Sequence, residues 1–350
     1  VKVRYVADAK FEGLDDYKAL RTLLRSHENI EYYLYNPINV FDPAMLAVDM
    51  HDKLFTVDDA TLIVGGANIG FSAYVYNHDL EVLVTRGERE SAAVAQVKAY
   101  YNELLTCRHT RRKTEKPDAK LGDYKKYLLD RYEAYYASKP FDKQRDYRAE
   151  GLPVDKITLA HNPIEGKKRA PQILETMFTL AEHSRDVIFQ TPYFCLTDPY
   201  LERFVRAAEK ADSFVLSTNS LYNSPNLAYG VYMKNRKKLL SPKLTLSEYQ
   251  GRLQIHGKAA VFDDRLTVVG SFNMDERSAH IDTESVLVID SRAFNAAMRD
   301  LLETYRAQSL AVGLDNAYEP GGFAPPEVPA DKRRLFAFYG RFFGLAIQLI

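Results

Sequence analysis

The sequence predicts an α/β fold built from two similar repeats, each a mixed β-sheet flanked by helices. Three observations carry this prediction. Apolar, β-branched strands alternate with stretches of helical spacing, a short pattern of polar residues occurs twice, and the order of elements around that pattern recurs. The chain has 350 residues, of which 46% are hydrophobic, and this is enough for two cores of ordinary size.

The repeated pattern has the same spacing in the two halves. The second half contains His256, Lys258, Asp263, Ser271 and Asn273, and the first half contains His51, Lys53, Asp58, Gly66 and Asn68 at matching positions. An acid follows each histidine at the same interval, Asp79 in the first half and Glu284 in the second. The halves differ where Ser271 stands opposite Gly66, so only the second half offers a hydroxyl there.

Strand geometry brings the side chains of each pattern together. Residues 258–262 and 266–269 have the composition of two strands joined by a turn, so His256 and Lys258 point to one face. Such a set suits an anionic phosphate, because Lys and Asn donate to its oxygens while a neutral imidazole attacks phosphorus or moves a proton. Metal binding is the competing interpretation, but an ammonium two residues from each imidazole opposes a cation.

The pattern HxKx4Dx6G[GS]xN, present in duplicate, resembles the signature of the phospholipase D superfamily, whose two-motif members carry it twice. The resemblance implies a pseudo-twofold molecule whose halves share one site, and a reaction that needs no metal or other cofactor. It implies that His51 is the nucleophile and His256 the acid and then the base, with phosphate bound by Lys53, Lys258, Asn68, Ser271 and Asn273. Asp58 and Asp263 complete the catalytic motif in a structural role, and Asp79 and Glu284 orient the histidines.

Four stretches of the second half look like bacterial cardiolipin synthases, most of all the C type: residues 190–194, 218–220, 229–240 and 270–278. The implied reaction is phosphatidyl transfer from a phospholipid, phosphatidylglycerol or phosphatidylethanolamine, to the glycerol hydroxyl of phosphatidylglycerol. The implied location is the cytoplasmic side of a bacterial cell membrane, with peripheral attachment. The alternatives are hydrolysis by a phospholipase D, a nuclease, and a non-catalytic protein that binds anionic lipid.

Charge and cysteine content narrow these alternatives. Lys and Arg together number 47, as do Asp and Glu, so no net charge attracts nucleic acid and we expect no nucleic-acid partner. Cys107 and Cys195 give no disulfide framework, which is compatible with a reducing compartment. The residues specify neither the oligomeric state nor the donor lipid.

The order of elements also repeats. The first half predicts a strand at 1–7, a helix at 15–25 and a strand at 30–35, and the second half predicts the same order at 214–218, 227–240 and 244–250. The second half has four further elements in front: a strand at 157–161, a helix at 171–183, a strand at 187–190 and a helix at 199–210. We therefore expect the first repeat to be truncated at its N-terminus.

These elements suggest four parts: a first repeat at 1–108, a charged connection at 109–155 with a helix at 124–137, a second repeat at 156–325, and an apolar, basic tail at 326–350. Three segments admit two interpretations each. Residues 36–50 are a loop packed on its own core or a lip of the site that faces acyl chains. Residues 111–113 are solvated or meet the phosphates of lipid headgroups or nucleic acid, and residues 333–350 dock on the core or lie in a membrane interface.

Overall fold

The computed structural model describes residues 1–10, 18–39, 41–69, 76–87, 92–116, 121–138, 146–166 and 168–343. The chain divides into two compact units. Unit 1 comprises Val1–Met50 and Ala99–Gly151, and unit 2 comprises His51–Lys98 and Leu152–Ile350. Both copies of the repeated pattern fall in unit 2, so this unit contains the candidate site.

Unit 1 is built on a three-stranded sheet in the order β1-β2-β7, with β1 (Val3–Asp8) parallel to β2 (Ile30–Tyr35) and β7 (Thr110–Lys113) antiparallel to it. Helices α1 (Lys18–Ser26) and α4 (Leu121–Ser138) confirm the predicted helices, although residues 11–17 lie outside the described part of the chain. Strand β7 was missed, because its charged sequence was assigned to a solvated connection. Arg111, Arg112 and Lys113 are in fact exposed side chains of that strand.

The segment at 36–50 contains a short 3-10 helix, η3 (Pro43–Ala47), and packs on unit 1. Met45 and Val48 are buried, and the Asn36 side-chain amide donates to the carbonyl oxygens of both residues at 2.7 Å. The described part of this segment therefore supports the packed-loop interpretation, although the side chains of Ile38 and Phe41 are exposed.

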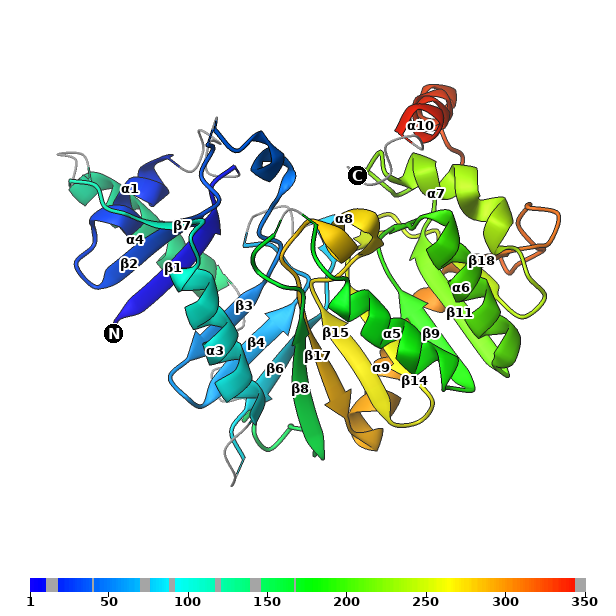
Figure 1. Ribbon diagram of the computed structural model, residues 1–350, viewed down its shortest axis with the longest axis horizontal. Helices are drawn as coiled ribbons and strands as arrows, with labels where there is room; N and C mark the ends of the chain where they lie inside the picture. The colour runs from blue at the N-terminus through cyan, green and yellow to red at the C-terminus, as the bar shows by residue number, and fades with distance from the viewer. Residues whose placement is uncertain are drawn as a thin grey trace. The chain divides into compact units, whose positions relative to one another are not determined.

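Unit 2 contains an eight-stranded mixed sheet in the order β18-β12-β11-β9-β14-β15-β17-β8. Its strands are β8 (Lys156–His161), β9 (Asp186–Gln190), β11 (Ser213–Asn219), β12 (Thr245–Tyr249), β14 (Lys258–Phe262), β15 (Leu266–Gly270), β17 (Ser285–Asp290) and β18 (Ser309–Val312). Strand β9 pairs with β11 in parallel and with β14 antiparallel, so it joins the two parts of the sheet (Figure 1). All the strands predicted in the second half are confirmed.

A second sheet of unit 2 comes from the first repeat and has the order β3-β4-β6 (Leu54–Val57, Thr61–Gly65, Glu81–Thr85). It corresponds to β14-β15-β17, just as β1-β2-β7 corresponds to β11-β12-β18. In the described part of the first repeat, no strand takes the position that β9 has in the second. In the first repeat, β1-β2-β7 and β3-β4-β6 are therefore two separate sheets.

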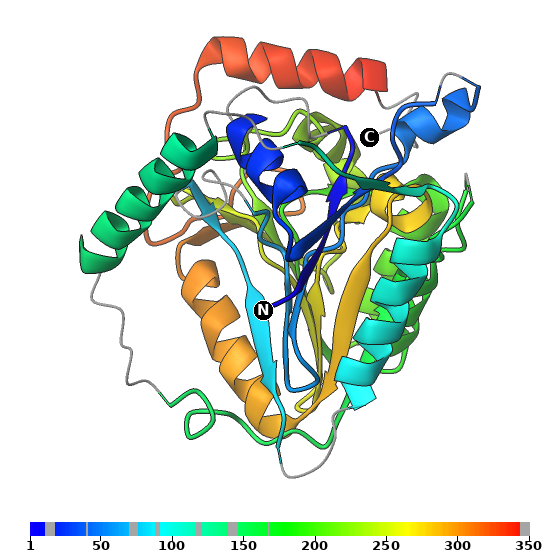
Figure 2. The same ribbon diagram turned by 90° about the vertical axis from the view of Figure 1, so that its left-hand side faces the viewer.

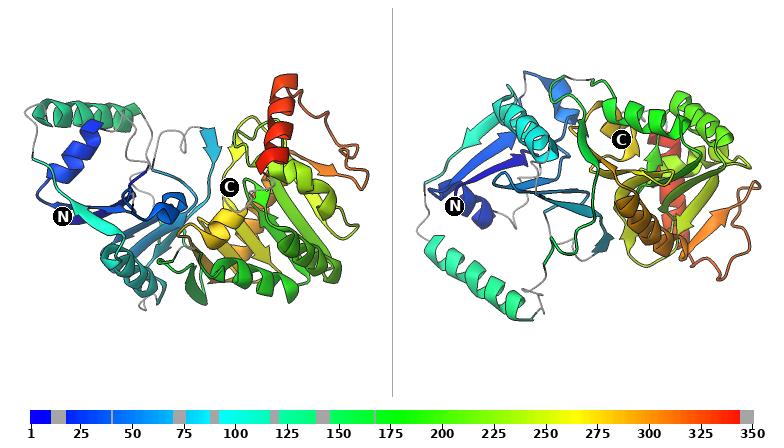
Figure 3. Two further views of the ribbon diagram at one scale, coloured as in Figure 1. Left: turned by 45° about the horizontal axis from the view of Figure 1, so that its top comes forward. Right: turned by 90° about the horizontal axis from the view of Figure 1, so that it is seen from below.

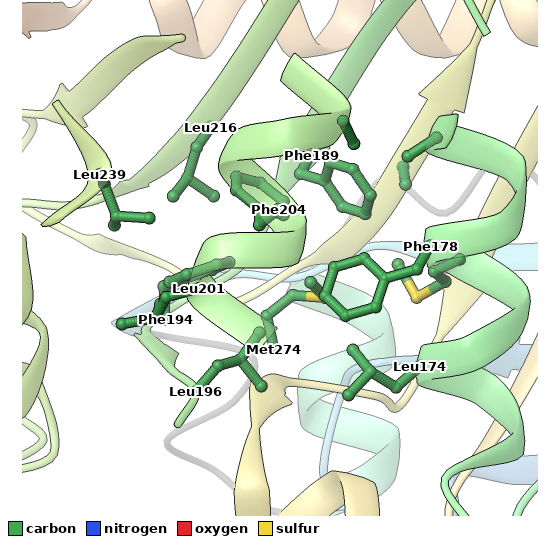
Figure 4. Packing of buried hydrophobic residues seen from close by; sticks show 14 of the residues in the cluster. Leu174, Phe178, Phe189, Phe194, Leu196, Leu201, Phe204, Leu216, Leu239 and Met274 are labelled. Carbon is green, nitrogen blue, oxygen red and sulfur yellow. The ribbon is translucent and has the colours of Figure 1, made fainter. Parts of the chain in front are cut away.

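Aromatic packing fixes the large sheet against its helices. One face is covered by α5 (Gln172–Glu182), α6 (Asp198–Lys210) and α7 (Tyr229–Asn235). The ring of Phe204 in α6 lies at the centre of a cluster of buried side chains, 4.8–6.3 Å from the rings of Phe178, Phe189, Phe194 and Phe214. Figure 4 shows this cluster between the helices and the sheet. Burial of this much aromatic surface holds the strands in one register.

The other face of the large sheet packs on α9 (Arg292–Arg306) and on the β3-β4-β6 sheet. Val64 of β4, Val261 of β14 and Leu287 of β17 are fully buried in this second cluster, to which α9 adds Met298 and Leu302. Figure 2 shows α9, in orange, alongside the strands. The strands that carry the two histidine patterns are thus packed on a common core. This packing places both patterns within one unit.

The last described helix, α10 (Ala330–Phe343), packs across α7 (Figure 3). The two helices meet at Gly230 and Gly340, where a Cβ atom on Gly340 would lie 2.2 Å from the Gly230 carbonyl oxygen. Only glycine allows this approach. The described part of the tail therefore docks on unit 2, and residues 344–350 lie outside the described part. Among the helices that the structure describes, none has the length and apolar character needed to cross a membrane.

Candidate active site

His51 and His256 lie just before the first strands of two equivalent hairpins, β3–β4 and β14–β15. Their turns contain Asp58 and Asp263, whose φ angles of 50° and 48° lie in the left-handed region that Asp tolerates. The Asp263 carboxylate accepts from the backbone N–H groups of Arg185 and Asp186 at 2.8 and 3.0 Å. Asp263 lies at the opposite end of β14 from Lys258, and its carboxylate contacts the backbone at the start of β9.

Each histidine is held by the acid of the other repeat. His51 Nδ1 lies 2.8 Å from Glu284 Oε1, and His256 Nδ1 lies 2.7 Å from Asp79 Oδ1. A carboxylate that accepts from Nδ1–H leaves Nε2 without a proton and able to act as nucleophile or base. The structure therefore brings the four residues together across the repeats.

Backbone hydrogen bonds fix this crossed arrangement. The His51 N–H donates to the Thr283 carbonyl at 3.1 Å, and the His256 N–H donates to the His78 carbonyl at 2.8 Å. In each case the acceptor directly precedes the acid that binds the imidazole. Strand β5 (Asn77–His78) also pairs with β13 (Gln254–Ile255), which leads into His256. Each imidazole and its acid are thus held by neighbouring backbone segments.

The two acids differ in their other contacts. Glu284 is fully buried and accepts from the hydroxyls of Ser271 and Ser278 as well as from His51. Among the described residues no hydroxyl donates to Asp79, and Gly66 stands where Ser271 stands in the second repeat. A Cβ atom on Gly66 would lie 2.9 Å from Asp79 Oδ1 and 3.2 Å from Lys258 Cδ. The second oxygen of Asp79, Oδ2, is buried and has no hydrogen-bond partner among the residues that the structure describes.

The two lysines lie beside the imidazoles. Lys53 Nζ donates to the His51 carbonyl at 2.5 Å, and Lys258 Nζ donates to the His256 carbonyl at 2.7 Å. Lys258 is only 3% exposed, and its Nζ lies 3.1 Å from both ring nitrogens of His256. Two ammonium groups in a buried site form a concentrated positive charge that favours an anion.

Burial keeps both imidazoles neutral. Burial and the nearby ammonium groups of Lys53 and Lys258 lower the pKa of His51 well below its usual range. Burial and Lys258 also lower the pKa of His256, while its hydrogen bond to Asp79 opposes this shift. Because His256 also lowers the pKa of His51, the two rings share one electrostatic environment. Both Nε2 atoms are therefore able to accept a proton or attack an electrophile at neutral pH.

The acids and lysines have shifted pKa values as well. Burial raises the pKa of Glu284 to about 8 despite the opposing charge of Lys53. At Asp79 burial also acts to raise the pKa, but the hydrogen bond and charge of His256 outweigh it, so that the pKa is lowered. Burial lowers the pKa of Lys258 to about 7 and that of Lys53 to about 8. Several strongly shifted groups in one place are typical of a catalytic site.

The predicted phosphate ligands are not equivalent. Asn273 is buried, and its amide donates to the Tyr193 hydroxyl at 3.1 Å. Asn68 at the matching position is exposed. Ser271 points its hydroxyl to Glu284, so it orients the acid. The structure thus places Asn273 in the buried site, whereas Asn68 lies at the surface.

Sequence reasoning did not identify Ser278 or assign Tyr193 a contact with the site. Ser278 follows Asp275, whose carboxylate accepts from the Ser278 N–H and caps α8 (Glu276–His280). The Asp-x-x-Ser spacing was a visible cap signal, but only the fold shows that the Ser278 hydroxyl reaches Glu284. Among the described residues, no three His, Cys, Asp or Glu side chains are grouped so as to hold a metal ion.

Two matching repeats, each with one His-x-Lys sequence and with histidines and acids paired across the repeats, define a protein of the phospholipase D class. The family model described as "Cardiolipin synthase, PLD-like domain" matches residues 1–105 and 176–306, which is more than half of the chain. The protein belongs to this family.

Similar proteins agree with this assignment. An uncharacterized protein of Helicobacter pylori strain J99 is 28% identical over 351 positions, covering 88% of this chain and 69% of the relative. Cardiolipin synthase C of Escherichia coli K12 is 26% identical over 342 positions, covering 83% and 70%. The crystal structure of phosphatidylserine synthase from Haemophilus influenzae Rd KW20 has a TM-score of 0.59 at 16% identity, covering 91% of this chain and 74% of that one, which shows a shared fold.

Proposed function

We propose that this protein is a phosphatidyltransferase that makes cardiolipin from phosphatidylglycerol and a phospholipid donor through a covalent phosphohistidine. It acts as a peripheral protein on the cytoplasmic side of a bacterial membrane. The observation that carries the proposal is the crossed pair of contacts, His51 with Glu284 and His256 with Asp79, beside the buried Lys258 and the half-buried Lys53. Family membership and the likeness to a cardiolipin synthase support the substrate class.

In the first step, His51 Nε2 attacks the phosphorus of the donor. A P–N bond forms and the P–O bond to the headgroup alcohol breaks. His256, which takes up a proton when the anionic phosphodiester binds beside it, gives that proton to the leaving oxygen. Lys53 and Lys258 bind the phosphate oxygens, on which the reaction concentrates negative charge. Asn273 acts with them as a neutral donor.

In the second step, the glycerol hydroxyl of phosphatidylglycerol replaces the departed alcohol. His256, now neutral, takes the proton of that hydroxyl, the oxygen attacks phosphorus, and the P–N bond breaks to regenerate His51. Asp79 keeps the His256 ring in one orientation through both steps. If water took the place of the acceptor hydroxyl, the product would be phosphatidic acid, as in a phospholipase D.

The test uses the purified full chain and vesicles of phosphatidylglycerol labelled in its headgroup, with and without phosphatidylethanolamine. We expect cardiolipin to form with release of glycerol, or of ethanolamine if that lipid is the donor. A protein with both histidines replaced by alanine is the control. If phosphatidic acid were the only product, the assigned reaction would be hydrolysis and not transfer. Cleavage of single- or double-stranded DNA without any lipid product would assign a nuclease.

The orienting acids give a further prediction. Asp79→Asn is expected to lower turnover about 10²–10³-fold, because an amide does not fix the His256 tautomer as a carboxylate does. Its fold should be unaffected, since asparagine has the size of aspartate and its Oδ1 can still accept from His256 Nδ1–H. Glu284→Gln should lower turnover similarly and also lower the melting temperature, because Ser271 and Ser278 each lose a carboxylate acceptor.

Steady-state rates and thermal unfolding of both variants check this prediction. Asp198→Asn, which removes an exposed carboxylate from α6, is the matched control and should leave both quantities near wild type. Unchanged turnover in Asp79→Asn would show that His256 needs no orienting acid.

A further inference from the structure

Helix α10 has an inner face and an outer face of different character. On the inner face, Phe336 and Gly340 are buried against α7, and Lys332 Nζ donates to the Tyr222 carbonyl at 2.9 Å. The outer face carries three large apolar side chains with exposed fractions of 48%, 62% and 63%: Leu335, Phe338 and Phe342. The helix is therefore anchored on one side and leaves its more apolar stripe exposed.

The three outer side chains form one stripe. Their spacing of three and then four residues places them on the same side of an α-helix, and the rings of Phe338 and Phe342 stack at 6.1 Å with planes 10° apart. Single exposed apolar residues are ordinary, but a contiguous aromatic stripe marks an interaction surface.

The charges around this stripe identify the kind of partner. Arg334 and Arg341 are seven residues apart and run along one edge of it, while the one acid of the described helix is Asp331 in its first turn. On the neighbouring segment, Lys234 of α7 and Lys237 of the 3-10 helix η4 (Arg236–Leu239) are also exposed. Aromatic side chains beside basic ones complement an anionic bilayer surface.

Contacts within unit 2 place α10 near the end of the unit that carries the site. The loop that binds Lys332 follows β11, whose last residue, Asn219, donates to the carbonyl of Ile255 at 2.8 Å, directly before His256. Helix α7 also packs on β10 (Phe194–Cys195), which pairs with β16 (Met274–Asp275) directly after Asn273. Figures 1 and 2 show α10 in red beyond this end of the sheet.

We propose that the outer face of α10 docks unit 2 on an anionic bilayer, with Leu335, Phe338 and Phe342 inserted between headgroups and Arg334 and Arg341 on lipid phosphates. The inference rests on the proposed function in one respect, because that function requires access to substrates held in a bilayer. Docking at α10 brings the end of the unit that carries the histidines to that surface.

The test measures binding of the full chain to vesicles of phosphatidylglycerol and of phosphatidylcholine. We expect wild type to prefer phosphatidylglycerol. Phe338→Ser/Phe342→Ser should lower that affinity about tenfold or more, and Arg334→Gln/Arg341→Gln should lower it about fivefold for each charge at low salt and less at high salt. Phe55→Ser, at an exposed phenylalanine of β3, is the matched control and should bind as wild type does.

Turnover of a short-chain phospholipid that stays monomeric separates docking from catalysis, and all these variants should turn it over at the wild-type rate. Wild-type vesicle affinity in the double Phe variant would overturn the docking proposal. So would a finding that these residues are needed for self-association in sedimentation and not for vesicle binding, since the face would then join two copies. If the double Phe variant lost vesicle binding while the wild-type protein turned over no phospholipid, docking would be upheld and the proposed function contradicted.

Discussion

Replacing either His51 or His256 with alanine is expected to lower turnover of a phospholipid by more than about 10⁴-fold. In the proposed mechanism the two rings act in one site, and in the structure each is bound by the acid of the other repeat and His256 lowers the pKa of His51. Loss of the nucleophile prevents the covalent step, and loss of the acid leaves an alkoxide that departs poorly. Neither histidine can substitute for the other.

An activated substrate distinguishes the two roles. If the leaving group is nitrophenol, its departure needs no proton, so a variant that lacks only the acid still forms the covalent intermediate. We expect His256→Ala to release about one equivalent of nitrophenolate per protein and then to stop, because the base for the second step is missing. We expect His51→Ala to release none, and mass spectrometry of the stalled His256→Ala protein should locate phosphate on His51.

His183→Ala, at an exposed histidine that ends α5, is the control and should turn over as wild type does. A burst from His51→Ala and none from His256→Ala would exchange the two roles. Sustained turnover by either single variant would refute a site shared between the repeats.

Local patterns in the sequence predicted which groups the structure brings together but not how they pair. The doubled His-x-Lys spacing located both imidazoles and both ammonium groups, since these positions depend only on short strands. Along the chain each acid follows the histidine of its own repeat, yet the structure pairs His51 with Glu284 and His256 with Asp79. This exchange depends on packing of β3-β4-β6 against the large sheet, which no spacing within one repeat encodes.

The remaining differences have the same origin. Strand β7 has the sequence of a solvated charged segment and becomes a strand because β2 offers it an edge. Asn68 and Asn273 match in sequence, but only Asn273 is buried and bound to Tyr193, because the second repeat has strands and helices around it that the described first repeat lacks. Tertiary contacts override the local signal in both cases.

Lys258→Met is expected to lower turnover about 10³-fold, because it removes a buried ammonium from the phosphate. The same change should raise the free energy of unfolding by about 1–3 kcal/mol. Lys258 is 3% exposed, Lys53 repels it, and among the described residues no carboxylate forms an ion pair with it. Methionine has a similar length and no charge to bury.

The pH dependence of this stabilisation identifies its cause. Burial lowers the pKa of Lys258 to about 7, below the 10.5 of an unperturbed lysine, so between these values the unfolded chain binds a proton that the folded protein does not. Wild-type stability therefore gains from a rise in pH through this window. The advantage of Lys258→Met over wild type should be largest below about pH 7 and should shrink as the pH approaches 10.5.

Chemical denaturation at several pH values measures this difference, with Lys210→Met on the exposed surface of α6 as the matched control. A variant less stable than wild type at every pH would mean that Asp79 and Glu284 more than offset the cost of burying the charge. A gain in stability together with lost turnover would show that Lys258 is kept at the expense of the fold, because a phosphate binds more tightly where positive charge is already desolvated. Bound substrate should then raise the pKa of Lys258, so turnover at saturating substrate should persist to higher pH than turnover at low substrate.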